Sequence, residues 1–155
     1  MRLTMRTNLA MRTLMFCAVN SARTVRKAEI ARACNASENH IAQVIHLLSQ
    51  KGYLRTTRGR NGGIRLGMAM EEINVGTVFR SFEADVPFAE CFQGVDNRCP
   101  LTAACRLRIA IVGAVGAFYA ALDGLSLADL VAGNRELHRI LTPPVLCDGP
   151  ALEPA

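Results

Sequence analysis

The spacing of apolar residues predicts three helices along the first fifty positions. Between about residues 4 and 19, apolar side chains recur every three or four positions, as in an amphipathic helix. The same spacing predicts a second helix over about residues 25–34 and a third that begins after Ser37, a good N-cap, and ends at Gly52. Asn35, which tolerates the left-handed conformation, makes the turn between them. Two short helices joined by such a turn are typical of a helix-turn-helix.

Beyond Gly52 the apolar period changes to that of short strands. Residues 53–57 and 64–66 predict two strands, and the segment RGRNGG between them supplies the turn of a hairpin. A basic hairpin directly after a helix-turn-helix is a wing. The predicted fold class is therefore mainly α with a small β wing, that is, a winged helix-turn-helix DNA-binding domain.

The second half of the chain predicts a further helix over about residues 70–82, then a loop of about 20 residues, a long helix over about 103–122 and a short helix over 127–131. The long helix is apolar on two faces, which is more than its own domain can easily cover. We interpret it as a dimerisation helix, against the alternative of an internal helix in a larger core. One face carries the larger apolar residues Leu107, Ile111, Ala114, Phe118 and Leu122. The other carries only small residues, namely Gly113, Gly116, Ala117 and Ala120.

Charge is distributed unevenly along the 155 residues, of which 50% are hydrophobic. Residues 1–65 hold twelve Lys and Arg against two acidic residues, whereas residues 66–155 carry a net charge of −5. A basic half joined to an acidic half predicts that one part meets a polyanion such as nucleic acid. The longest uncharged apolar run, residues 109–122, is too short to cross a bilayer. We therefore exclude a membrane protein. The Arg-rich first 16 residues run into the next element with no cleavage region, and Arg6 and Arg12 interrupt any apolar signal core, so we expect a cytoplasmic protein.

We predict that the third helix enters the major groove of double-stranded DNA and that the wing reaches the backbone or the minor groove. The two arginines of the wing supply positive charge, and its paired glycines permit close approach. His40 has the alternative of being a surface residue at the start of its helix. The predicted DNA-binding residues are Ser37, Asn39, His40, Gln43, Arg58, Arg60, Asn61, Gly62 and Gly63.

The six cysteines fall into two groups. Cys17 and Cys34 lie on apolar helix faces, where a small buried hydrophobe is expected, and Cys147 lies in the tail. The other three cross the long loop with the spacing C-x7-C-x5-C, and nearby arginines and a helix N-terminus favour their thiolate form, which binds metals. These three are Cys91, Cys99 and Cys105.

Several chemistries compete for these three thiols. A disulfide framework is disfavoured by the odd number, and a zinc site usually contains a C-x2-C pair, which this chain lacks. An iron–sulfur cluster tolerates wider spacing, and Cys99-Pro100 matches the Cys-Pro of ferredoxin ligand runs. A cluster, a zinc site, a redox thiol switch and no special role at all stay open on spacing alone. An enzyme is not expected, because no acid–base pair lies near the cysteines.

Several segments of the chain resemble one family of regulators. They are MRLTMRTNLAMRTLMF, NASENHIAQVIHLLSQKGYLRTTRGRNGGIRLG, ECFQGVDNRCPLTAACRL and FYAALDGLSLADLV. Over about residues 1–141 the chain is similar to the NsrR-like nitric-oxide-sensing repressors of the winged-helix iron–sulfur regulator family, which also includes IscR and RirA. The resemblance implies a homodimer on a palindromic operator, with an iron–sulfur cluster (4Fe–4S favoured, 2Fe–2S possible) bound in each subunit by Cys91, Cys99 and Cys105.

The fourth cluster ligand is where this chain departs from the family. Some members use an aspartate of the first helix, and the matching residue here is Asn8, a poor anionic ligand. Others use a histidine three residues after the last cysteine, where this chain has Arg108. The remaining candidates are a water, a small thiol, and the carboxylates of Glu83, Asp85 and Glu90.

The family sets the expected signal, and the predicted elements set the expected division of the chain. Nitric oxide is the predicted signal, and the chain is predicted to be a repressor. The alternative within the family is an iron-responsive repressor, as in RirA. The alternative outside the family is a winged-helix regulator that depends on redox state or on zinc. Residues 1–82 would form the DNA-binding domain, 83–105 the cluster-binding loop, 106–141 the dimerisation helix and C-terminal helix, and 142–155 a disordered tail.

Overall fold

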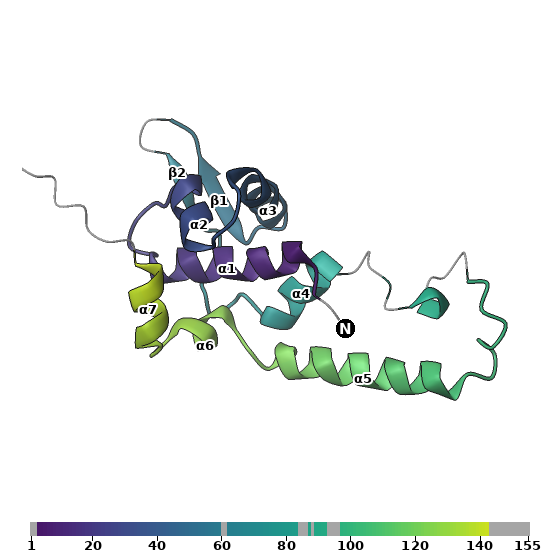
Figure 1. Ribbon diagram of the computed structural model, residues 1–155. Helices are drawn as coiled ribbons and strands as arrows, with labels where there is room; N and C mark the ends of the chain where they lie inside the picture. The colour runs from purple at the N-terminus through teal and green to yellow at the C-terminus, as the bar shows by residue number, and fades with distance from the viewer. Residues whose placement is uncertain (1–2, 60–61, 84–86, 88, 93–96, 143–155) are drawn as a thin grey trace, which may run out of the picture.

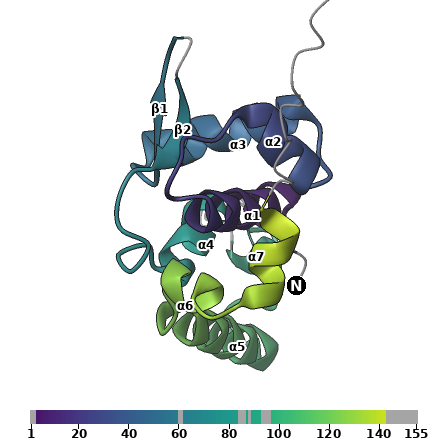
Figure 2. The ribbon, with the colours of Figure 1, turned by 90° about the vertical axis from the view of Figure 1, so that its left-hand side faces the viewer.

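A central helix organises the molecule. The computed structural model describes residues 3–59, 62–83, 87, 89–92 and 97–142. Helix α1 (Met5–Val19) lies between a layer formed by α2, α3 and the wing and a second layer that contains α4, α6 and α7 (Figures 1 and 2). Nine of its fifteen residues are buried, as expected for a helix covered on more than one face. The predicted first helix is confirmed.

The helix-turn-helix consists of α2 (Lys27–Ala33) and α3 (Glu38–Gln50). Asn35 takes the left-handed conformation, with φ of +48°, as predicted. The predicted start of α2 at residue 25 is wrong, because the backbone of Val25 forms a β-bridge with Ile64 through hydrogen bonds of 3.0 and 2.9 Å. That long-range pairing delays the helix by two residues and joins it to the wing.

The wing is a two-stranded antiparallel sheet of β1 (Leu54–Thr57) and β2 (Gly63–Leu66). Leu54 lies opposite Leu66, and Thr57 lies opposite Gly63. The hairpin extends beyond the helices (Figure 1). Its base is fixed to the core by the buried side chains of Leu54 and Ile64. The predicted fold class, mainly helical with a small β wing, is confirmed.

The layer on the other side of α1 contains α4 (Val75–Glu83), α6 (Leu127–Val131) and α7 (Arg135–Leu141). Helix α4 begins five residues later than predicted, because the Asn74 side chain accepts from the backbone N–H of Thr77 at 2.9 Å and ends the preceding turn. Helix α6 matches its prediction, and Ser126 caps it. Helix α7, with Asn134 as its N-cap, was not predicted.

Helix α5 (Arg106–Asp123) lies along the outside of the molecule and packs on α4. It begins three residues later than predicted because residues 99–104 form turns. The half-buried face includes Ile111, Phe118 and Leu122, as expected. Leu107 is 67% exposed and Ala114 is also exposed, so these two residues of the predicted large face are uncovered in the single chain.

None of the residues of α5 is buried in the single chain. The predicted small face, which contains Gly113 and Gly116, is exposed, and the interpretation of α5 as an internal helix is therefore wrong for this chain alone. Within the described residues, we find no helix that combines the length and apolar character needed to span a bilayer. A disordered tail is predicted over residues 142–155. The structure describes only residue 142 of this tail, and residues 143–155 lie outside the described part.

Candidate nucleic-acid interface and cysteine loop

Helix α3 presents a polar face to solvent. Its apolar residues Ile41, Val44, Ile45 and Leu48 are buried against the core, which fixes the rotation of the helix. Asn39, His40 and Gln43 are exposed as a result. His46, which the sequence prediction missed, is also exposed. It follows Asn39 by seven positions and Gln43 by three, so its helical spacing places it on the same face.

Ser37 has a structural role at the start of α3. Its hydroxyl oxygen accepts from the backbone N–H of His40 at 3.3 Å and thus satisfies one of the unpaired donors of the first turn. Ser37 and His40 are both exposed. The Ser37 oxygen is therefore engaged in the helix cap. The His40 side chain is exposed in the first turn of α3.

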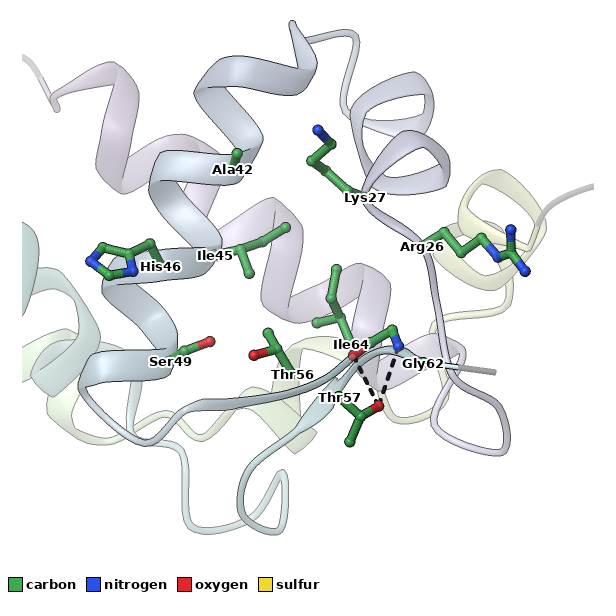
Figure 3. Close-up of a pocket in the computed structure, with 11 residues that line it drawn as sticks. Arg26, Lys27, Ala42, Ile45, His46, Ser49, Thr56, Thr57, Gly62 and Ile64 are labelled. Atoms are coloured by element: carbon green, nitrogen blue, oxygen red, sulfur yellow. Dashed lines mark hydrogen bonds between the residues drawn. The ribbon is translucent and has the colours of Figure 1, made fainter. Parts of the chain in front are cut away.

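A groove of about 470 Å³ separates α3 from the wing (Figure 3). Arg26 and Lys27, at the start of α2, and His46 of α3 line it together with Thr56 and Thr57 of β1. Lys27 forms an ion pair with Glu38 at 3.1 Å. The groove therefore combines cationic side chains with threonine hydroxyls, the groups that commonly contact nucleic-acid phosphates.

The two glycines of the wing lie too close to neighbouring backbone atoms to carry a side chain. A Cβ at Gly62 would overlap the carbonyl oxygen of Thr57, and one at Gly63 would lie 2.6 Å from the carbonyl oxygen of Val25. Thr57 further fixes the turn, because its Oγ1 accepts from the N–H of Gly63 at 3.2 Å (Figure 3). Arg58 is exposed at the end of β1. Two predicted contact residues, Arg60 and Asn61, lie outside the described residues.

Cys105 is the N-cap of α5. Its Sγ accepts from the backbone N–H of Arg108 at 3.4 Å, which places the sulfur at the positive end of an eighteen-residue helix. Cys91 lies in the short 3-10 helix η1 (Glu90–Phe92). Its carbonyl oxygen accepts from Nε of Arg108 at 3.2 Å. One arginine thus bonds to both Cys91 and Cys105.

Cys99 is held in a separate turn. Its N–H donates to Oδ1 of Asn97 at 3.0 Å, and its carbonyl oxygen accepts from Oγ1 of Thr102 at 2.8 Å. Asn97 Nδ2 also donates to Thr102 Oγ1, at 2.8 Å. All three loop cysteines are free and half-buried. This turn leads directly into Cys105 and α5.

The three thiols suit an iron–sulfur cluster by chemistry, but the structure does not gather them. Within the described ranges, no three His, Cys, Asp or Glu side chains lie close enough together to hold one metal ion. Two of the three predicted ligands meet at Arg108, and the third is ordered by its own turn. The ligand role of the trio stays a prediction.

The candidate fourth ligands have different surroundings. Asn8 is exposed in the second turn of α1. The carboxylate of Glu83 accepts from the backbone N–H and the hydroxyl of Thr4, each at 2.9 Å, and from the hydroxyl of Thr7. Asp85 lies outside the described residues, and Glu90 begins η1. Glu83 therefore serves the N-terminus of α1 in this conformation.

Cys17 and Cys34 are buried, as predicted, at 2% and 3% exposure. Burial, together with the nearby Cys34, raises the pKa of the Cys17 thiol to about 12. Burial also raises the pKa of Cys34, against the opposing influence of Arg12. Both thiols are therefore neutral at physiological pH, and both are buried, whereas the three loop thiols are half-buried.

Together, the two helices, the wing and the outlying α5 define a winged helix-turn-helix regulator fold. The profile of the Rrf2 family, described as "Iron-dependent Transcriptional regulator", matches residues 3–133. The chain belongs to the Rrf2 family.

Comparison with individual proteins agrees with this assignment. The HTH-type transcriptional regulator NsrR of Bacillus licheniformis is 40% identical over 143 residues, which are 92% of this chain and 100% of that protein. The expectation that the chain is not an enzyme is confirmed by this relationship.

Two solved structures share the fold. IscR of T. potens has a TM-score of 0.66 at 19% identity and covers 84% of this chain and 85% of its own. CymR of B. subtilis, called the global cysteine regulator, has a TM-score of 0.64 at 23% identity, over 84% of this chain and 96% of its own.

Proposed function

We propose that this chain is a DNA-binding transcriptional repressor, acting in the cytoplasm, whose affinity for its operator is controlled by an iron–sulfur cluster that reacts with nitric oxide. The observation that carries the proposal is the loop of three free, half-buried cysteines between the winged helix-turn-helix and α5. The 40% identity between this chain and an NsrR protein supports the choice of nitric oxide as the signal.

The DNA contacts follow from the exposed groups of α3 and the wing. Asn39, His40 and Gln43 would face base edges in the major groove, with His46 on the same face. Arg58 would reach the backbone or minor groove with the wing. Because the groove with Arg26 and Lys27 lies between α3 and the wing, it would lie over the phosphates between the two DNA grooves.

The cluster would be held by Cys91, Cys99 and Cys105, with 4Fe–4S favoured and 2Fe–2S possible. When bound, it would supply iron atoms that nitric oxide attacks. The helix N-terminus would stabilise the negative charge of the Cys105 thiolate, and the guanidinium of Arg108, bonded to the backbone carbonyl of Cys91, would add positive charge to this end of the loop. Binding a cluster would require the three thiols to lie closer together than they do among the described residues. The fourth ligand stays open between Asn8, the remaining carboxylates and an exogenous group.

The loop is linked to the DNA-binding helix through α1. The loop begins immediately after Glu83, whose carboxylate binds Thr4 and Thr7 at the start of α1. Helix α1 in turn packs on α3. A loop that changes conformation when the cluster is lost would therefore act on the support of α3. A coupling of about 1–3 kcal/mol would weaken operator binding about 5- to 150-fold.

A homodimer would present two α3 helices to a palindromic operator. Helix α5 supports this arrangement, because it exposes Ile109 and Val112, which share one face of the helix, at 72% and 50%. A symmetric pairing of two such faces would bury the apolar side chains that the single chain leaves in water.

The decisive test compares wild-type protein with Cys99→Ala in anaerobic gel-shift titrations on operator DNA, with and without nitric oxide. We expect cluster-loaded wild type to bind tightly and to lose affinity on nitrosylation, whereas Cys99→Ala should bind weakly and not respond. Cys147→Ala, a thiol change outside the loop, is the matched control and should behave as wild type. Tight, nitric-oxide-responsive binding by Cys99→Ala would contradict the proposal.

Iron-responsive repression is the second candidate function, favoured by the iron-dependent description of the family. The same residues would hold the cluster, but its loss under iron limitation would be the signal. A promoter fusion compared under iron limitation and under nitric oxide separates the two candidates. Derepression by nitric oxide at ample iron supports the first, and derepression by iron limitation alone supports the second.

A further inference from the structure

The first turns of α5 contain one residue that differs from its neighbours in exposure. Arg108 is half-buried, while Arg106, Leu107 and Ile109 are exposed. Its guanidinium does not point into solvent as a surface arginine on an amphipathic helix commonly does. Instead it contacts a segment seventeen residues earlier in the chain.

Three contacts join Arg108 to both ends of the cysteine loop. Its Nε donates to the carbonyl oxygen of Cys91 at 3.2 Å, and its Cζ lies 5.8 Å from the centre of the Phe92 ring, within cation–π range. Its backbone N–H donates to Sγ of Cys105 at 3.4 Å. The same residue therefore holds η1 through its side chain and the N-cap sulfur of α5 through its backbone.

We propose that Arg108 is a positioning residue that docks Cys91 against Cys105 in the metal-free chain, so that two of the three loop thiols are held near each other before any cluster is bound. A guanidinium suits this role because it stays charged at every physiological pH and is not itself a metal ligand. The docking itself is independent of the proposed function; its benefit to cluster assembly rests on that function.

The charge of Arg108 adds to the effect of its position. Two thiolates brought together repel each other, and the guanidinium, which is bonded to the backbone carbonyl of Cys91, would add a fixed positive charge next to that residue. Arg106, two residues earlier on the same helix, carries the same charge but is exposed. Comparing substitutions at the two positions therefore separates the contact with η1 from a general loss of positive charge.

The experiment measures how often Cys91 and Cys105 meet in the apo protein. Full-length protein with Cys99→Ser and Cys147→Ser is treated anaerobically with a short bis-maleimide, and cross-linking is followed by intact mass. Cys17 and Cys34 are buried and should stay unmodified. We expect Arg108→Gln to lower the rate of cross-linking about 2- to 10-fold, the equivalent of one hydrogen bond, and Arg106→Gln to leave it unchanged. Glutamine has a helix propensity close to that of arginine, so α5 should persist in both variants.

A second measurement uses the loop with all its cysteines. Apo protein is supplied with ferrous iron and sulfide under anaerobic conditions, and cluster formation is followed by absorbance and iron content. We expect slower assembly in Arg108→Gln than in Arg106→Gln or wild type. If no variant, wild type included, takes up iron and sulfide, the proposed function fails while the cross-linking result still decides the positioning role. Equal cross-linking in Arg108→Gln and wild type, or an equal loss in Arg106→Gln, would overturn the inference.

Discussion

The carboxylate of Glu83 joins the end of α4 to the beginning of α1. It accepts hydrogen bonds from Thr4 and Thr7, which lie in the N-terminal turn of α1, where a negative charge is favoured by the helix dipole. Sequence patterns gave Glu83 only as one candidate ligand, since the contact spans nearly eighty residues. A carboxylate engaged in this way would have to release α1 before it could bind a metal.

Replacing Glu83 by Gln tests this role. The amide keeps the shape of the side chain but loses the charge, so the bonds to Thr4 and Thr7 should weaken. We expect the free energy of unfolding to fall by about 1–2 kcal/mol, as measured by urea titration. Glu71→Gln, which removes the same charge at an exposed position, is the control. Equal stabilities of the two variants would contradict the assignment.

We predict that a thiol reagent modifies the loop cysteines of the native protein and leaves the buried cysteines unmodified. Because the pKa of Cys17 is raised to about 12, its thiol stays protonated far above neutral pH. In native apo protein at pH 8, we expect a thiol reagent to modify Cys91, Cys99 and Cys105 while Cys17 and Cys34 stay unmodified until denaturant is added. Peptide mass spectrometry gives the rate at each site. Comparable rates for Cys17 and Cys99 would show that the core opens readily.

The raised pKa of Cys17 also determines how its contribution to folding stability changes with pH. The folded state holds this proton more tightly than the unfolded chain, so its contribution to stability is complete below the ordinary thiol pKa near 9. It is lost as the pH rises from there toward 12. Alkaline unfolding should therefore begin in this window and shift in Cys17→Ala.

At the scale of elements, local signals predicted most of the fold. The first helix, α3, the wing and α6 were found because each combines a clear apolar period with its own cap or turn residue, such as Ser37 and Ser126. The start of α2 was missed because it depends on the pairing of Val25 with Ile64, far away in sequence. The cysteine spacing predicted which residues share the loop, but contacts such as that of Arg108 with Cys91 have no local signature.

The wing offers a prediction about close packing. A Cβ at Gly63 would lie 2.6 Å from backbone and side-chain atoms of Val25 and Thr24, so Gly63→Ala should disturb the pairing of β2 with the start of α2. We expect a loss of about 1–3 kcal/mol in stability, visible as a lower Tm, and weaker operator binding. Gly124→Ala is the control, because its nearest neighbouring atom lies 3.8 Å from the added Cβ. A Gly63→Ala protein with unchanged Tm would show that the wing accommodates the methyl group.

At the scale of the whole molecule, α5 is tied firmly at one end. Arg80 of α4 binds both carboxylate oxygens of Asp123 at 2.5 and 2.6 Å and lies over the ring of Tyr119, at 4.7 Å from its centre. The hydrogen bond from Arg80 lowers the pKa of Asp123. A Cβ at Gly76 would overlap Asp123, so α4 and α5 approach closely here. The first turns of α5 contact the cysteine loop instead, through the side chain of Arg108.

That exposed face gives the last prediction, which follows from the proposed homodimer. Val112 is 50% exposed near the middle of α5, and Val112→Glu would place a charge where two chains are proposed to meet. An unpaired charge buried at an interface costs several kcal/mol, so we expect the variant to be monomeric by light scattering at concentrations where wild type is dimeric. Its operator affinity should fall too, because each half-site would then be bound separately.

The control for this variant is Ile140→Glu, on α7, which introduces the same charge at a residue that is 60% exposed but lies away from α5. It should remain dimeric. A Val112→Glu protein that stays dimeric and binds a palindromic operator normally would require another surface to join the subunits. The loop cysteines would then have no dimer interface beside them through which to act, and control of DNA affinity would have to pass within one chain, through Glu83 and α1 alone.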